Sequence, residues 1–326
     1  MGQWNFLLVA FGELLTPQTA AYALATLGLA VHFGYTGLLN FGQAGFMAVG
    51  GYAFAVTAVT FNQPLWVCVV AAVVGSVLLA LLLGIPTLRL RADYLSIVTI
   101  GTAEIIRLIV RSPELQPWTG GSTGINRSGD DFYALNPLPS DFTIKLGTIV
   151  YNSDAVWIRI VAWAVVILAA LFVWQLMRSP WGRVVKGVRE NEDAVRALGK
   201  NVFAYKMQVL IIGGVLAGVG TIFAIMPTSL QPDNYGTQTT FFLWAILLLG
   251  GAATVLGPIV GSMIFWALLA LTDGFVALGV TNGILPITTL QSGQIRYMLV
   301  GLALMLLVIF RPQGIFGKKS EVMFNA

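Results

Sequence analysis

Residues 181–206 read WGRVVKGVRENEDAVRALGKNVFAYK and lie between two apolar runs, 156–177 and 207–226. Seven of the 18 Lys and Arg residues fall between Arg178 and Lys206. Because this number of charges would be costly inside a bilayer, we predict that the segment is a polar connection between two membrane spans. A long charged helix in such a place is a poor membrane element and indicates a docking surface for a soluble partner.

The composition requires that the rest of the chain lies in lipid. The chain is 57% hydrophobic and only 10% charged, whereas soluble domains carry about 25% charged residues. Only helices and closed barrels satisfy the backbone in a bilayer, and the apolar runs are continuous rather than alternating, which excludes a barrel. We expect a single all-α, polytopic membrane domain over residues 1–326, with membrane lipid around it and no nucleic-acid partner.

The apolar runs predict about eight to nine transmembrane segments, because one span needs roughly 20 apolar residues. Residues 3–15 are too short to span. The run 239–272 is too long for one helix, and Gly250-Gly251 and Gly257-Pro258 predict two breaks in it. The predicted spans lie near 18–34, 38–60, 64–84, 93–110, 156–177, 207–226, 239–251, 256–272 and 295–311.

Orientation follows from the basic residues, which concentrate in three connections. These hold Arg89 and Arg91, the segment 178–206, and the end of the chain with Arg311, Lys318 and Lys319. The connection 112–155 is acidic instead. The positive-inside rule predicts that the basic connections and the tail 312–326 are cytoplasmic, whereas 112–155 is an external loop.

Polar residues within the spans are candidates for a translocation path, because such groups normally face a cavity or a partner. Glu104 and Arg107 share a helix face and can form either an internal salt bridge or a pair that lines the path. His32, the only histidine, is expected to be structural. Cys68 is the only cysteine, so no metal site is expected. The candidate path residues are Asn40, Gln43, Thr99, Glu104, Arg107, Gly250, Gly251, Gly257 and Pro258.

The external loop contains the sequence PWTGGSTGI at 117–125, which predicts a tight turn with free backbone amides. Such amides can hold a carboxylate, although an ordinary loop has the same composition. The candidate residues of this motif are Thr119, Gly120, Gly121, Ser122, Thr123 and Gly124.

Within the polar segment, residues 191–199 carry the end signals of a short helix. These are Asn191 at the N-cap, Glu192 and Asp193 in the first turn, Arg196 near the last turn, and Gly199 after the C-terminus. Ala194, Val195 and Leu198 give it a small apolar face. A helix of about eight residues is marginal alone in water, so it needs a partner surface. The bilayer surface and the groove of a soluble motor are both possible.

A motor would have to be a separate protein. No GxxxxGK[ST] phosphate-binding loop occurs in the sequence, so the chain has no Walker-type ATP site of its own. If ATP drives transport, another subunit hydrolyses it.

Six stretches, in order and over nearly the whole chain, resemble the permease subunits of branched-chain amino-acid ABC importers, the LivM type of the LivH/LivM family. In the fifth, Ala253 stands where relatives often have glycine. The stretches are LLNFGQAGFMAVGGYAFA (38–55), LRLRADYLSIVTIGTAEIIRLI (88–109), TGGSTGI (119–125), VRENEDAVRALGKNVFAYK (188–206), GGAATVLGPIVGSMI (250–264) and RPQGIFG (311–317).

The resemblance implies a non-enzymatic transport subunit in the bacterial cytoplasmic (inner) membrane. Its implied partners are a LivH-like second permease, two LivG/LivF-like ABC ATPase subunits that bind ATP and Mg, and an external substrate-binding protein. This chain would bind no cofactor. The sequence does not decide whether the second permease is LivH-like or a second copy of this chain. The coupling helix to the ATPase would comprise Arg189, Glu190, Asn191, Glu192, Asp193, Ala194, Arg196, Leu198 and Gly199.

The predicted function is therefore ATP-driven uptake of branched-chain or related amino acids delivered by the binding protein. One alternative is a urea or amide importer of the same family. A second is an ion-coupled secondary transporter with Glu104 or Glu13 as the proton carrier, which the neighbouring Arg107 opposes. A purely structural membrane protein would leave the broken helices and the coupling-like helix unexplained.

Overall fold

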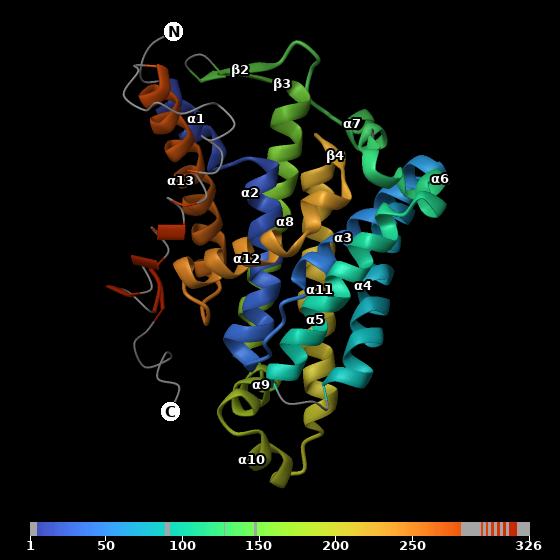
Figure 1. The fold of residues 1–326 in the computed structure, drawn as a ribbon, viewed down its shortest axis with the longest axis vertical. Coiled ribbons are helices and arrows are strands. Elements are labelled where there is room, and N and C mark those ends of the chain that lie inside the picture. The colour runs from blue at the N-terminus through green and yellow to red at the C-terminus, as the bar shows by residue number, and fades with distance from the viewer. Residues whose placement is uncertain are drawn as a thin grey trace.

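The computed structural model describes residues 5–88, 92–126, 128–146 and 149–281, together with single positions and short pieces between 295 and 317. Long helices run roughly parallel to the long axis of the molecule (Figure 1). They are α2 (Pro17–Leu29), α3 (Gln43–Ala55), α4 (Leu65–Thr87), α5 (Ala92–Arg111), α8 (Ser153–Arg178), α11 (Val202–Ile225) and α13 (Leu256–Thr281), whereas α12 (Thr237–Gly250) lies across them.

Five of the described helical segments are long and apolar enough to cross a membrane, or six if α1 (Asn5–Glu13) and α2, bent by 43° at their junction, count as one span. The five are Gln43–Thr60, Leu65–Thr87, Ser153–Arg178, Val202–Ile225 and Leu256–Val280. The all-α polytopic class is confirmed, although fewer segments pass than the eight to nine predicted.

Two predicted spans fall outside this set for different reasons. α5 has 20 residues, but Asp93, Glu104, Arg107 and Arg111 make it too charged. α12 is apolar but has only 14 residues. The predicted span 295–311 lies largely outside the described residues.

Two spans contain π-helical turns, and the predicted span 38–60 begins later than expected. The first span continues past α2 as η1 (Ala30–Gly34), and α3 continues as η2 (Val56–Thr60). Residues 37–42 are irregular, because Gly37 has a φ of +74° and α3 starts only at Gln43. An unwound stretch inside a membrane protein needs other groups to satisfy its backbone.

The two ends of the molecule differ. One end carries α9 (Pro180–Glu190) and α10 (Glu192–Ala197), and we call it the α10 end (Figure 1). The opposite end, which we call the loop end, carries the connections 112–152 and 226–236. Its elements are η3 (Pro113–Leu115), α6 (Gln116–Thr119), η4 (Gly121–Thr123), β1 (Ile125–Asn126), α7 (Asp130–Ala134), β2 (Thr143–Leu146), β3 (Ile149–Asn152), β4 (Ser229–Leu230) and η5 (Pro232–Tyr235).

Short strands tie the loop end together. β1 pairs antiparallel with β4, with Ile125 opposite Leu230, and β2 pairs antiparallel with β3, with Thr143 opposite Asn152. The first pair joins the two connections, so they lie on the same side of the helical body. The acidic connection 112–155 and the basic segment 178–206 are therefore at opposite ends, as the charge pattern predicted.

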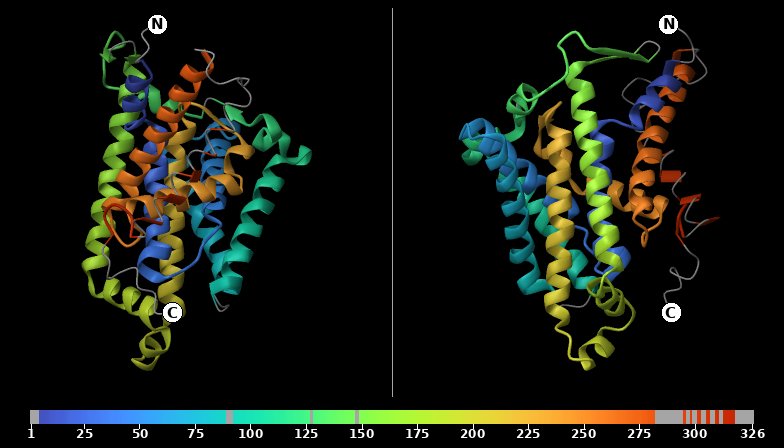
Figure 2. Two further views of the ribbon diagram at one scale, coloured as in Figure 1. Left: turned by 60° about the vertical axis from the view of Figure 1, so that its left-hand side comes forward. Right: turned by 180° about the vertical axis from the view of Figure 1, so that it is seen from behind.

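α11 is the centre of the fold and runs along most of its length (Figure 2). It packs against α2, α3 and α4. A Cβ on Gly50 of α3 would lie 2.3 Å from the Cα of Gly218 in α11, so the two backbones touch there. Glycine permits this close approach of the two helices, since no larger residue fits there.

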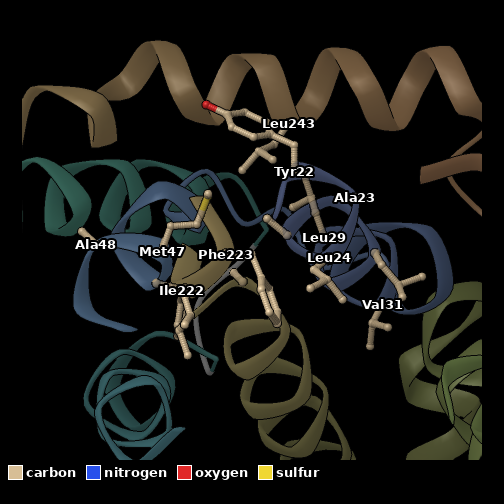
Figure 3. Packing of buried hydrophobic residues seen from close by; sticks show 14 of the residues in the cluster. Tyr22, Ala23, Leu24, Leu29, Val31, Met47, Ala48, Ile222, Phe223 and Leu243 are labelled. Atoms are coloured by element: carbon tan, nitrogen blue, oxygen red, sulfur yellow. The ribbon is translucent and has the colours of Figure 1, made fainter. Parts of the chain in front are cut away.

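Apolar side chains fill the space around this crossing. Leu24 from α2, Met47 from α3, Ile222 and Phe223 from α11, and Leu243 from α12 belong to one buried cluster (Figure 3). Four helices thus share a core, which fixes the unwound segment 37–42 beside it.

Candidate functional site

The polar segment 178–206 folds as two short helices with one shared cap. The Asn191 side chain accepts a hydrogen bond from the Ala194 amide at 3.0 Å, and the same residue ends α9. Gly199 follows α10 with a φ of +75°. The predicted N-cap and terminal glycine are confirmed. The assignment of Arg189 and Glu190 to the same helix is wrong, because both lie in the last turn of α9.

The apolar residues of α10 do not form one face. Val195 is buried against Val188 of α9 and Val202 of α11. Ala194 is exposed, and Leu198 has 78% of its surface exposed. Part of the partner surface that this helix needs is therefore supplied by the chain itself, and an exposed leucine remains at the tip of the α10 end.

Ion pairs tie α10 to α11. Glu192 accepts hydrogen bonds from Arg196 at 2.9 Å and from Lys206, and Arg196 also donates to Asp193 at 2.7 Å. Exposed pairs such as those of Arg196 contribute about 0.2–1 kcal/mol each. They fix the direction of α10 more than they stabilise the fold.

A cavity of about 1160 Å³ opens beside these helices at the α10 end. It lies between the start of the unwound segment 37–42, α5, α9, α10 and the start of α11. Its lining is mostly polar and includes Thr36, Leu95, Arg189, Glu192, Asn201 and Lys206. The cavity separates α10 from the unwound segment.

Asn40 and Gln43 lie in a buried hydrogen-bond network, with exposed fractions of 1% and 0%. Asn40 donates to the Gln43 side chain at 3.0 Å, and Gln43 donates to the carbonyls of Ala25 at 3.0 Å and Gly213 at 3.1 Å. These bonds hold the unwound segment between α2 and α11. The side chains that were predicted to lie near the path are thus used to position the backbone.

His32 and Thr99 complete this network. The Nε2 atom of His32 lies 3.2 Å from the Leu210 carbonyl, which can only accept, so Nδ1 accepts from Asn40 at 3.1 Å. The Thr99 hydroxyl accepts from the Phe41 amide at 3.0 Å and donates to the Ser96 carbonyl at 3.0 Å. His32 thus has the structural role that was predicted.

Glu104 and Arg107 form the predicted pair near the loop end of α5. Arg107 donates to the Glu104 carboxylate at 2.5, 3.0 and 3.1 Å, and with Nη1 to Asp233 of η5 at 2.7 Å. Arg111 donates to Asp233 at 3.1 Å and to Ser122 at 3.4 Å. The network joins α5 to η4 and η5. Sequence reasoning missed Asp233 and Arg111, although Arg111 follows Arg107 by one helical turn.

The motif 119–124 is a tight turn, as predicted. Gly120, Gly121 and Gly124 have positive φ angles. Thr119 donates to the carbonyls of Val110 at 2.7 Å and Leu115 at 2.9 Å, and Thr123 donates to the Gly120 carbonyl at 2.7 Å. Both hydroxyls stabilise the loop itself, which favours the ordinary-loop interpretation of the motif.

The run 239–272 contains one break rather than two. α12 ends at Gly250, Gly251 has a φ of +112°, and α13 begins at Leu256. Gly257 and Pro258 lie in the first turn of α13, where proline needs no backbone donor. Ala253 is absent from the described residues with positive φ, so a glycine is not required there.

The C-terminal segment satisfies the carbonyls that this break exposes. The Leu249 carbonyl accepts from the Ile315 amide at 2.9 Å, and the Gly250 carbonyl accepts from the Phe316 amide at 3.0 Å. The RPQGIFG motif thus packs against the GGAATVLGP motif. Neither motif alone reveals this contact in the sequence.

A family model described as branched-chain amino acid transport system / permease component matches residues 13–309. The chain belongs to this family. It is a multi-pass membrane transport permease and not a catalytic enzyme. As a member of an ABC importer family, the permease works with ATPase and binding-protein partners.

Several relatives are similar over most of the permease. The high-affinity branched-chain amino acid transport system permease protein LivM of Salmonella typhimurium is 29% identical over 96% of this chain and 71% of its own length. The probable LivM protein of Methanocaldococcus jannaschii is 24% identical over 92% of both chains. The nucleoside ABC transporter permease protein NupC of Lactococcus lactis is 25% identical over 88% of both.

The loop end of the permease holds a second cavity that the sequence did not reveal. Its volume is about 340 Å³, and its lining combines amides and hydroxyls with aromatic rings, including Gln18, Tyr22, Asn234, Gln238 and Trp266. Burial raises the pKa of Tyr235, another lining residue, so its phenol stays neutral. These residues come from four separate elements, so no local sequence pattern marks them.

Proposed function

We propose that this permease forms half of the membrane channel of an ATP-driven importer for branched-chain or related amino acids. An external binding protein delivers the solute, a LivH-like permease completes the channel, and two LivG/LivF-like ATPases bind ATP and Mg. The assembly lies in the bacterial cytoplasmic membrane with the α10 end and the C-terminus in the cytoplasm.

The observation that carries this proposal is the geometry of α10. Its inner side is fixed by Val195 and Glu192, whereas Leu198 points away from the fold and is 78% exposed. One side of α10 is buried against the fold, and its exposed apolar tip lies at the basic end of the molecule. This arrangement suits a helix that binds a soluble motor. A helix that lay flat on lipid would turn its apolar residues to one side.

The proposed path runs beside the unwound segment and the α12–α13 break. Asn40, Gln43 and Thr99 position the segment, and Gly250 and Gly251 form the break. Glu104 and Arg107 lie near the external mouth, where their charges are neutralised within the network that Asp233 and Arg111 complete. Such a mouth suits a neutral or zwitterionic solute, because no unpaired charge attracts ions there.

A specific observation supports a nucleoside as the second candidate substrate. The similarity to the nucleoside permease covers 88% of both chains. The aromatic rings of the cavity at the loop end, which Asp233 also lines, offer stacking surfaces for a base. Urea or an amide remains an alternative within the same mechanism. An ion-coupled mechanism is disfavoured, because the Glu104 carboxylate already accepts three hydrogen bonds from Arg107.

Reconstitution tests the proposal. The permease is co-purified with its second permease and ATPases, placed in proteoliposomes, and supplied with ATP inside and the binding protein outside. We expect uptake of radiolabelled leucine that stops without ATP, and little uptake of guanosine or urea. Uptake of guanosine but not leucine would show that the substrate is a nucleoside and would leave the ATP-driven mechanism unchanged. Uptake by the permease alone, driven by an ion gradient, would overturn the mechanism itself.

A further inference from the structure

Arg189 turns away from the docking side of the polar segment and into the membrane domain. Its Nη1 atom donates to the Gly34 carbonyl at 2.5 Å. On the way it crosses Gly37, where a Cβ would lie only 3.5 Å from Arg189 Cγ. A residue assigned by sequence to the ATPase-binding helix thus contacts the other side of the cavity at the α10 end.

Gly34 passes this contact on to the α12–α13 break. A Cβ on Gly34 would lie 1.8 Å from the Ala252 carbonyl oxygen, so the backbones of the two residues are in direct contact. Gly34 is also the last residue of the π-helical turn η1. Single π-helical turns occur frequently at functional sites. Arg189, Gly34 and Ala252 therefore form a continuous line from α9 to the break.

α10 is fixed to α9, so a push on α10 reaches Arg189. The buried cluster of Val188, Val195 and Val202 joins the two helices, and they share Asn191 as a cap. A Cβ on Gly187 would lie 3.1 Å from the Val195 side chain, which shows how closely they pack. The direct hydrogen bond to the first span comes from Arg189, two residues before the shared cap.

We infer that Arg189 is a positioning residue for transport, which carries displacement of α9–α10 through Gly34 to the α12–α13 break. The inference rests on the proposed function, because it needs an ATPase that moves α10. A line of contacts alone does not demonstrate coupling. The required demonstration is a change at the break that depends on both ATP and the Arg189 hydrogen bond.

The test places a reporter at the break. Cys68→Ser removes the only native thiol, and Ala253→Cys introduces a new one at a half-buried position. The rate of maleimide labelling is measured in the assembled transporter with and without ATP and vanadate. The same preparations give ATP hydrolysis and the retention of the ATPase on the purified permease.

Three variants distinguish the effect of the Arg189 hydrogen bond from the effects of side-chain size and of positive charge. Arg189→Met keeps a long stem over Gly37 but has no donor, Arg189→Lys keeps a donor, and Arg183→Met removes an exposed charge from the same helix. We expect Arg189→Met to reduce the ATP-dependent change in labelling about tenfold, the shift that loss of one charge-assisted hydrogen bond gives. Arg189→Lys and Arg183→Met should keep the response, and all three should retain the ATPase.

Each other result overturns the inference. A normal response in Arg189→Met shows that the bond is not needed, and an equal loss in Arg189→Lys shows that donation does not matter. Loss of the ATPase from Arg189→Met would make Arg189 a docking residue instead. If labelling does not change with ATP even when Arg189 is present, the α12–α13 break does not move during the ATPase cycle. Failure of leucine uptake in the wild type would count against the proposed substrate only, because the labelling requires no solute.

Discussion

Gly50 and Gly218 bring α3 and α11 together until their backbones touch, so these two positions control the central crossing. A valine at position 50 would force the helices apart, since its Cβ alone would lie 2.3 Å from the Gly218 Cα. Overpacking of this kind costs about 1–3 kcal/mol or more. We expect Gly50→Val to lower the melting temperature of the detergent-solubilised permease, measured by the loss of its monodisperse chromatographic peak on heating.

The matched control is Gly101→Ala in α5, where a Cβ would meet no atom within 4 Å. Alanine favours a helix over glycine by about 1 kcal/mol, so this variant should melt at the same or a higher temperature. Equal losses in both variants would show that the close crossing has no special role in stability.

Glu104 decides between ATP-driven and ion-driven transport. In Glu104→Gln, Arg107 keeps its hydrogen bond to Asp233 at 2.7 Å, so the loop end stays joined. We expect ATP-driven uptake to persist within a few-fold of the wild type, because a partly exposed ion pair contributes only about 1 kcal/mol or less. Radiolabelled uptake into proteoliposomes measures this, and a complete loss with normal ATP hydrolysis would revive the proton-carrier role.

At the scale of elements, α10 offers a test of the motor interface. Leu198 is 78% exposed and does not belong to the buried cluster of Val188, Val195 and Val202. Leu198→Asp should therefore leave the permease folded but remove the ATPase, because it places a charge in an apolar contact. Co-purification of the ATPase measures the effect. Leu198→Met keeps the apolar surface and should retain the ATPase, and retention by both variants would exclude Leu198 from the interface.

The sequence predicted α10 well because its signals are local. Asn191 and Gly199 act on backbone groups within a few residues, so their types alone mark the ends of the helix. The same reasoning gave the break at Gly250-Gly251 and the Glu104–Arg107 pair. It failed at Gly257-Pro258, because these residues are equally acceptable in the first turn of a new helix.

Contacts between distant residues could not be predicted. Arg189 and its acceptor Gly34 are 155 positions apart, and Arg107 and Asp233 are 126 positions apart. The polar residues Asn40 and Gln43 were assigned to the path because a buried amide needs partners. Gln43 donates to the backbone carbonyls of Ala25 and Gly213, which have no sequence signature, and Asn40 donates to Gln43 and His32.

At the scale of the whole molecule, the charge asymmetry between the two ends predicts how the permease is oriented in the membrane. Six of its basic residues, from Arg183 to Lys206, lie in the polar segment that forms the α10 end, whereas Asp130, Asp131 and Asp141 lie at the loop end. The positive-inside rule counts basic residues near the spans, so we predict that the α10 end faces the cytoplasm. In that orientation the β1–β4 pair keeps both connections of the loop end outside.

Single thiols at the two ends test this orientation in the Cys68→Ser background. Asp141→Cys and Leu198→Cys both replace exposed side chains. A membrane-impermeant maleimide added to intact spheroplasts should label Asp141→Cys at once and Leu198→Cys only after the membrane is opened. The opposite pattern would place α10 outside, where no ATPase could reach it, and would remove the basis for ATP-driven transport along with the role of Arg189.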